Sequence, residues 1–211
     1  MAFVKICGIT NVDDALRAVE LGADAVGMVF APSPRRVKRE KAKSINDELP
    51  ASVKKVGVFV NETLEEVKKI VDLCRFDIIQ LHGDENIKDF RCIRKDIIKT
   101  IHIGKNNIEE EISKINKDID YLLFDTYIKG LAGGSGKSFQ WEKVIKLKEL
   151  DIPIILSGGL TPQNVREAIN TVKPFGVDVS SGVEDYPGKK DFQKLEEFIR
   201  NAKEGFGEFD G

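Results

Sequence analysis

Apolar residues along this chain follow two alternating spacings. Short runs rich in β-branched residues, typical of buried strands, are separated by longer stretches whose apolar positions recur at helical spacing. The pattern therefore predicts strand–helix units repeated along the whole chain. The runs that predict strands are Phe3–Cys7, Ala25–Phe30, Lys55–Val60, Asp77–Leu81, Ile97–Ile101, Tyr121–Phe124, Pro153–Leu156 and Gly176–Val179.

The stretches between these runs predict amphipathic helices. Asn11 is a candidate N-cap for the first helix. Thr161–Pro162 is expected to open the seventh, because a capping residue there precedes a proline that suits the first helical position. The last helix is expected to bury an apolar face made of Phe192, Leu195, Phe198 and Ile199.

Strands that alternate with helices run parallel, which leaves an open doubly wound sheet or a closed barrel. Regular units of about 26 residues, without a reversal or a long connection, favour the eight-stranded barrel. The sequence therefore predicts one α/β domain, a (β/α)8 TIM barrel over residues 1–204. The remaining segment, Gly205–Gly211, is rich in glycine and acidic residues and is expected to be a frayed tail.

Composition and charge narrow the class of protein. The 211 residues are 41% hydrophobic and 32% charged with a net charge of −2, which excludes a disordered chain and gives no drive toward nucleic acid. No apolar run is long enough for a membrane span, so no membrane partner is expected. Three separated cysteines fit a reducing compartment, and we expect a cytoplasmic protein.

Polar residues directly after an apolar run are the candidates for chemistry, because parallel barrels place their active sites at the carboxyl ends of the strands. Cys7, His82 and Asp125 stand at such ends. Each has a structural alternative: a small buried thiol, a polar rim residue or a turn cap. The turns after the last two strands expose backbone N–H groups suited to a phosphate, and they contain Gly158, Gly159, Ser180 and Ser181.

Two other segments have more than one interpretation. Gly133–Ser138 resembles a nucleotide-binding P-loop, but Leu131 stands where that pattern needs glycine, so a lid over the barrel mouth is preferred. The basic residues after the second strand, Arg35 to Arg39, can be a solvated surface or can hold an anionic group.

Several motifs in order resemble phosphoribosylanthranilate isomerase, and the resemblance extends from about Val4 to Ala202. They are Lys5-Ile6-Cys7-Gly8-Ile9-Thr10, Gln80-Leu81-His82-Gly83, Asp125, Gly133-Gly134-Ser135-Gly136-Lys137, Ser157-Gly158-Gly159-Leu160, Asp178-Val179-Ser180-Ser181-Gly182-Val183-Glu184 and Pro187-Gly188-Lys189-Lys190. Thr126–Lys129 departs from the family pattern.

The resemblance implies an Amadori rearrangement in tryptophan biosynthesis, without cofactor or metal. By analogy Asp125 is the general acid and Cys7 the general base. The Cys7 thiol pKa, ordinarily about 8.5, is expected to be lowered by its surroundings or by bound substrate. Arg36, with Arg35 as the fallback, is expected to hold the anthranilate carboxylate, and His82 is a further substrate-binding candidate. The expected partner is a small phosphorylated substrate, and the chain is expected to be a monomer or a homodimer.

Two other classes of function stay open from the residues alone. One is another phosphosugar barrel enzyme, either a pentose-phosphate epimerase or the next synthase of the same pathway, although two histidines argue against a histidine-rich metal centre. The other is a non-catalytic barrel used for binding or assembly, against which the pairing of Cys7 with Asp125 argues.

Strand alternation adds one expectation that does not depend on the family. If Cys7 points into the barrel mouth, Phe3 and Lys5 point inward and Val4 and Ile6 face the helices. The eighth strand closes on the first, and a buried ammonium needs a partner. We therefore expect Lys5 to lie within about 4 Å of Asp178, with another acid or water as the alternative partner.

Overall fold

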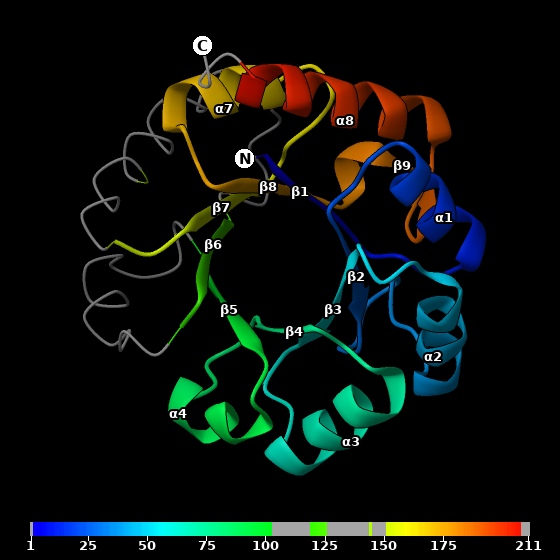
Figure 1. The fold of residues 1–211 in the computed structure, drawn as a ribbon, viewed down its shortest axis with the longest axis vertical. Helices are drawn as coiled ribbons and strands as arrows, with labels where there is room; N and C mark the ends of the chain where they lie inside the picture. Colours follow the sequence, from blue (N-terminus) through cyan, green and yellow to red (C-terminus); the bar gives the residue numbers. More distant parts are fainter. Residues whose placement is uncertain (1, 103–118, 126–143, 145–150, 208–211) are drawn as a thin grey trace.

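The computed structural model describes residues 2–102, 119–125, 144 and 151–207. Within them, eight parallel strands close into a barrel in which each strand pairs with the next along the chain and the last pairs with the first (Figure 1). The predicted fold is confirmed, and every strand agrees with its expected range to within one residue at each end. The strands are β1 (Phe3–Cys7), β2 (Ala25–Val29), β3 (Lys54–Phe59), β4 (Ile78–Leu81), β5 (Asp96–His102), β6 (Tyr121–Asp125), β7 (Ile154–Ser157) and β8 (Gly176–Val179).

Helices surround the barrel on the outside (Figure 1). The described ones are α1 (Val12–Glu20), α2 (Arg39–Glu48), α3 (Leu64–Cys74), the short α4 (Ile87–Phe90), α7 (Val165–Val172) and α8 (Phe192–Gly207). Between β8 and α8 the chain forms a 3-10 turn at Ser181–Val183 and a small antiparallel hairpin of β9 (Glu184–Tyr186) and β10 (Lys189–Lys190), which the sequence analysis did not predict. Within the described residues, no helix is long and apolar enough to cross a membrane.

Alternate residues of each strand divide between two apolar cores. Val4 and Ile6 are fully buried in the larger core, which lies between the strands and the helices. Phe3 packs instead against the smaller core inside the barrel, and Lys5 is completely buried. The alternation expected for the first strand is confirmed. The interior core consists of Ala25, Val56, Ile78, Ile98, Leu123 and Ile155.

Three local expectations were wrong. Helix α7 begins at Val165 rather than at Thr161–Pro162, which instead form a turn closed by the Asn164 side chain accepting from the Thr161 N–H at 2.8 Å. Phe192 is 40% exposed at the start of α8, so it does not join the buried face of that helix. The helix also continues to Gly207, because Phe206 packs into the outer core and extends the ordered helix beyond the boundary expected at residue 204, whereas 208–211 lie outside the described residues.

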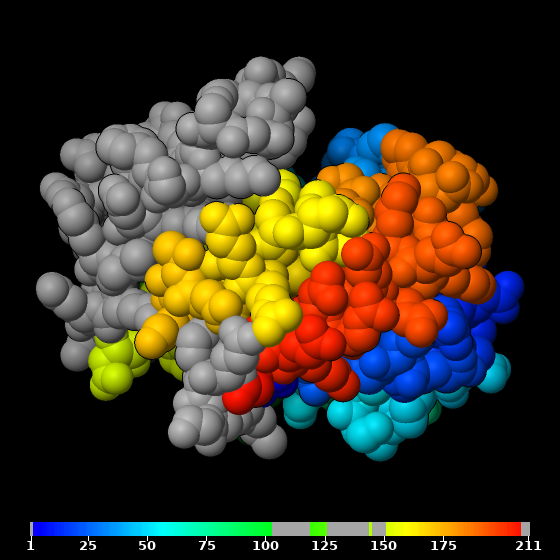
Figure 2. Space-filling model, turned by 90° about the horizontal axis from the view of Figure 1, so that it is seen from above, coloured from blue at the N-terminus to red at the C-terminus, as the bar shows by residue number. Residues whose placement is uncertain are grey.

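The end of the chain packs against its beginning and against the seventh unit. In Figure 2, α8 (red and orange) lies between α7 (yellow-orange) and the blue N-terminal segment that carries α1. The turns after β7 and β8 also meet, because a Cβ on Gly182 would lie only 1.9 Å from the Leu160 carbonyl oxygen. Only glycine permits this approach, which holds the two turns side by side.

Replacement of Gly182 by alanine should therefore destabilise the fold. The added methyl overlaps backbone atoms that cannot rotate away, so we expect a loss of about 1–3 kcal/mol in the free energy of unfolding. Gly207→Ala is the matched control, because a Cβ there meets no atom of the rest of the described structure within 4 Å. Chemical denaturation of both variants measures the difference, and equal stability of the two would contradict the contact.

Candidate active site

The carboxyl ends of β1 and β8 carry a buried ion pair beneath a cysteine. Lys5 Nζ lies 2.7 Å from Asp178 Oδ1, with neither side chain more than 7% exposed, and the two residues are register partners across the closing strands. The predicted contact is confirmed. Ser157 at the end of β7 donates its hydroxyl to the other oxygen of Asp178 at 3.3 Å. The pair thus links three adjacent strands inside the barrel.

Cys7 lies directly above this pair. A Cβ on Gly27, its register partner in β2, would lie 3.0 Å from the Cys7 sulfur and 3.3 Å from Lys5 Nζ, so the thiol and the ammonium share the space that this glycine leaves open. Cys7 is 7% exposed. The inward direction expected for it is the direction observed.

The expected direction of the Cys7 pKa was wrong for the chain without substrate. Burial raises the pKa of the thiol, and the neighbouring Lys5 ammonium only partly offsets this effect. Burial also opposes the charge of Lys5, but Asp178 and Cys7 together outweigh this effect and raise the pKa of Lys5. Lys5 therefore stays an ammonium paired with Asp178, and Cys7 rests as a neutral thiol.

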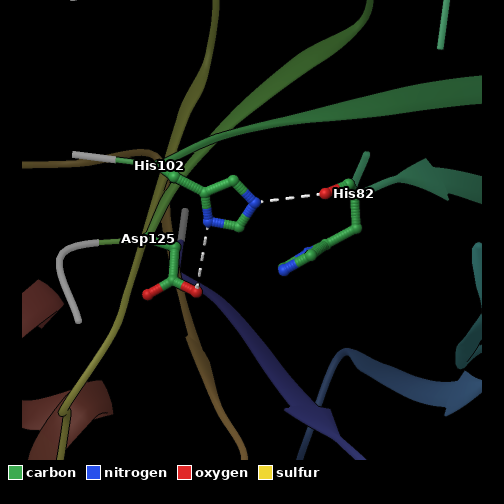
Figure 3. Close-up of side chains that lie close together, drawn as sticks. All are labelled: His82, His102 and Asp125. Atoms are coloured by element: carbon green, nitrogen blue, oxygen red, sulfur yellow. Dashed lines mark hydrogen bonds and ion pairs between the residues drawn. The ribbon is translucent and has the colours of Figure 1, made fainter. Parts of the chain in front are cut away.

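The carboxyl ends of β4, β5 and β6 place two histidines beside an aspartate (Figure 3). Asp125 and His102 are register partners, and Asp125 Oδ2 lies 3.9 Å from His102 Nδ1. The His102 ring packs edge-on against the His82 ring with centroids 4.7 Å apart. His102 was missed by the sequence analysis, although it directly follows the apolar run Ile97–Ile101 and thus carried the same signal as His82.

The turns expected to bind phosphate do come together. Gly158 and Gly159 both have positive φ, and a Cβ on Gly159 would meet no atom within 4 Å, so this backbone is not covered by described residues. Asn164 fixes the turn by donating to the Gly159 carbonyl at 3.0 Å. Ser180 and Ser181 follow β8 in the turn that packs against it through Gly182. All four residues thus belong to one pair of adjoining turns.

The two arginines after β2 have different environments. Arg35 makes a bidentate pair with Glu184, at 2.8 Å from Nε and 2.6 Å from a terminal nitrogen. Arg36 is exposed, and its side chain makes no hydrogen bond or ion pair with the described part of the chain. A guanidinium committed to Glu184 is less suited to a substrate, so the geometry favours Arg36 over Arg35.

Glu184 and Lys190 form a buried polar cluster that sequence reasoning missed. Lys190 Nζ donates to the carbonyl oxygens of Cys7 at 2.7 Å and Ser180 at 3.0 Å and to Glu184 at 3.1 Å. Burial favours the neutral acid, but Arg35 and Lys190 outweigh it and lower the pKa of Glu184. One ammonium therefore ties the strand end that carries Cys7 to the turn after β8. The sequence pattern that could have indicated this cluster is the Pro187-Gly188 turn, which lies between acidic and basic residues.

Two segments of the predicted site lie outside the described residues. They are the glycine-rich stretch Gly133–Ser138 and the departure at Thr126–Lys129. Both the lid interpretation and the P-loop alternative for the first of them stay predictions.

Comparisons with known proteins agree with one another. The model of the N-(5'-phosphoribosyl)anthranilate isomerase family matches residues 4–201. The enzyme of that name from Bacillus cereus (strain B4264) is 47% identical over 202 residues, which cover 95% of this chain and 98% of the relative.

Solved structures give the same result. The chain superimposes with a TM-score of 0.85 and 42% identity on phosphoribosyl anthranilate isomerase in complex with reduced 1-(o-carboxyphenylamino)-1-deoxyribulose 5-phosphate, covering 97% of this chain and 100% of that one. A structure described as monomers generated from the dimeric enzyme of Thermotoga maritima gives a TM-score of 0.84 with 42% identity and the same coverage.

Lys5→Met should destabilise the barrel strongly, because it leaves the Asp178 carboxylate buried without its ammonium. We expect a loss of about 3–5 kcal/mol in the free energy of unfolding, most of which Lys5→Met combined with Asp178→Leu restores. Lys69→Met is the matched control, because its pair with Glu65 is exposed on α3 and is worth only about 0.5 kcal/mol. Denaturant unfolding measures all three, and a Lys5→Met loss no larger than that of the control would contradict the importance of the pair.

Proposed function

The chain belongs to the N-(5'-phosphoribosyl)anthranilate isomerase family, and from this premise we propose which of its residues perform the reaction. It is the isomerase that converts N-(5'-phosphoribosyl)anthranilate into 1-(2-carboxyphenylamino)-1-deoxyribulose 5-phosphate in tryptophan biosynthesis. The aldose-to-ketose conversion moves one proton away from C2 of the sugar, so it needs an acid and a base at different points of one bound substrate. The observation that carries the assignment is that Cys7 and Asp125 stand at the carboxyl ends of two different strands of the barrel.

Asp125 is the proposed general acid. In its protonated form it donates a proton to the ring oxygen of the ribose, the bond from C1 to that oxygen breaks, and the anilino nitrogen supplies the electron pair that forms a protonated Schiff base. A carboxyl group is suited to this step because it holds a transferable proton at the substrate. Its side chain is 24% exposed, which leaves it within reach of a ligand at the strand ends.

Cys7 is the proposed general base. As thiolate it removes the proton from C2, and the electron pair of the broken C–H bond moves into the Schiff base to give a neutral enolamine. Tautomerisation of the enolamine gives the ketone product. Lys5 supports this role, since its ammonium beside the sulfur stabilises the thiolate that the step requires.

The remaining residues are assigned to binding. Backbone N–H groups of the adjoining turns at Gly158, Gly159, Ser180 and Ser181 are proposed to hold the phosphate, since several N–H donors in one place suit an anion. Arg36 is proposed to bind the anthranilate carboxylate, because a planar guanidinium pairs with a carboxylate in bidentate fashion.

The proposed partner is a small phosphorylated substrate, which the phosphate of the ligand in the related complex supports. His82, whose ring lies near Asp125, is the further proposed substrate contact. For the oligomeric state we propose a monomer or a homodimer. The related enzyme from Thermotoga maritima is dimeric.

Cys7→Ala and Asp125→Asn should each abolish most of the activity. Alanine cannot take the C2 proton, and the amide keeps the shape of the acid without its transferable proton. We expect each variant to lose well over 10-fold in kcat, a barrier increase above about 1.4 kcal/mol, while still binding a product analogue. Loss of substrate fluorescence follows turnover. Cys74→Ser is the control, since this thiol lies on α3 in the outer core, and a Cys7 or Asp125 variant with more than about a tenth of the wild-type rate would contradict its assigned role.

The pH dependence should show a base with a raised pKa. Because burial raises the pKa of the Cys7 thiol, this thiol is mostly protonated near neutral pH in the substrate-free chain. Its deprotonation to the thiolate activates the base. We therefore expect kcat/KM to rise with pH through the neutral and mildly alkaline range, since kcat/KM reports groups of the free enzyme. A kcat/KM that is flat over this range, measured with a substrate-independent check of folding, would contradict Cys7 as the base.

A further inference from the structure

Lys190 in β10 is completely buried, and its ammonium group contacts both halves of the proposed site. Its Nζ donates to the carbonyl oxygens of Cys7 at 2.7 Å and Ser180 at 3.0 Å, and to Glu184 Oε1 at 3.1 Å. Carbonyl and carboxylate oxygens only accept, so a lysine that donates to all three of them needs the three N–H groups of the ammonium. Burial lowers the pKa of Lys190, but the geometry of these contacts requires its charged form.

The surroundings of Lys190 have an excess of positive charge. Glu184 accepts from Lys190 and also from Arg35, whose Nε lies at 2.8 Å and whose terminal nitrogen lies at 2.6 Å. The two cations lower the pKa of Glu184 and keep it ionised. Two positive charges therefore share one negative charge, and one positive charge is left over. We call Arg35, Glu184 and Lys190 the charge cluster.

The charge cluster lies against the chain directly after Cys7. Gly8 has a φ of +76°, and a Cβ on it would lie 2.7 Å from Arg35 Cδ and 2.8 Å from the Ser180 hydroxyl oxygen. The lack of a side chain at Gly8 thus leaves room for both. The charge cluster, the strand end that carries Cys7 and the turn after β8 are therefore in direct contact.

The charged groups that face the Cys7 thiol in the described part of the chain are Lys5 in β1, Asp178 in β8, Lys190 in β10 and Arg35 after β2. Lys5 and Asp178 pair with each other, so together they add no net charge. The excess positive charge near the thiol therefore belongs to the charge cluster. Lys190 lowers the pKa of the thiol, against the effect of burial.

We propose that Lys190 is a positioning residue that couples the base to the phosphate. Its ammonium holds the carbonyl groups of Cys7 and Ser180 in place, and the charge cluster supplies positive charge that the thiolate and the substrate phosphate share. Lys190 contacts backbone atoms at both places, so it acts through Cys7 and the turn after β8. This proposal rests on the proposed function. The alternative is that Lys190 only fastens the hairpin of β9 and β10 to the barrel.

Alkylation with iodoacetamide separates these roles, at about pH 7, below the ordinary thiol pKa of about 8.5. The rate at Cys7 follows its thiolate fraction, and tryptic peptides separate it from the exposed Cys92, which is the internal reference. In Lys190→Met we expect alkylation of Cys7 to be at least about 3-fold slower, because a pKa higher by about one unit outweighs the greater nucleophilicity of the thiolate. Lys189→Met is the matched control and should keep the wild-type rate, because this lysine of the same hairpin pairs with Asp14.

A purely structural role predicts the opposite result, because a loosened hairpin exposes the thiol and speeds its alkylation. An equal or faster rate at Cys7 in folded Lys190→Met, or the same slowing in Lys189→Met, would overturn the proposal. Arg35→Met provides the test if Lys190→Met does not fold, since it removes one positive charge of the charge cluster from a side chain that is 22% exposed. It should also slow the alkylation of Cys7, and an unchanged or faster rate would overturn the proposal.

Inorganic phosphate tests the other half of the coupling without turnover, because a bound ligand raises the Tm. At equal phosphate concentration the rise in Tm should be at least about 2-fold smaller in Lys190→Met than in the wild type and Lys189→Met. Equal shifts in all three would overturn the shared charge. Slower alkylation in Lys190→Met with an unchanged kcat/KM would support the coupling and contradict Cys7 as the base, so failure of the proposal and failure of the proposed function are distinguishable.

Discussion

The ion pair between Lys5 and Asp178 is the interaction on which the arrangement of the site depends. Two charges inside a barrel cost several kcal/mol unless they meet, and these two meet across the strands that close the barrel. The pair requires β1 and β8 in one register and directs alternate residues of β1 inward. Cys7 therefore points to the strand ends, above an ammonium that favours its ionised form. Closure of the fold and activation of the proposed base thus use the same side chain.

Much of the fold could be predicted because parallel strands buried on both faces appear in the sequence as short apolar runs. Phe3–Cys7 and Gly176–Val179 were predicted to the residue. Positions decided by tertiary contacts were predicted less well. Thr161–Pro162 has the composition of a helix start, but the Asn164 side chain closes a turn there and the helix begins after it. The hairpin of β9 and β10 depends on a charge cluster with partners far away in the sequence.

The candidate site shows the same division between local and distant information. The predicted ends of the strands identified Cys7, His82 and Asp125 as candidates. The alternation of inward and outward side chains along the strands identified the partner of Lys5. The sequence could not give the direction of the Cys7 pKa, because the outcome depends on the depth of burial as well as on the ammonium nearby. The choice between Arg35 and Arg36 likewise needed Glu184, a residue 149 positions away from Arg35 in the sequence.

The bond from Lys190 to the Cys7 carbonyl has a consequence for the order in which the enzyme is built. These two residues are 183 positions apart, and Lys5 and Asp178 are 173 apart, so the environment of the thiol consists of contacts between the first strand and the last segments. At a synthesis rate of about 5–20 residues per second, the partners of β1 are synthesised roughly ten seconds or more after β1 itself. Non-local contacts of this kind also form late in folding, because loop closure precedes them. A nascent or truncated chain therefore contains Cys7 but lacks the contacts that would make it the proposed base, and we expect activity to begin only when the barrel closes.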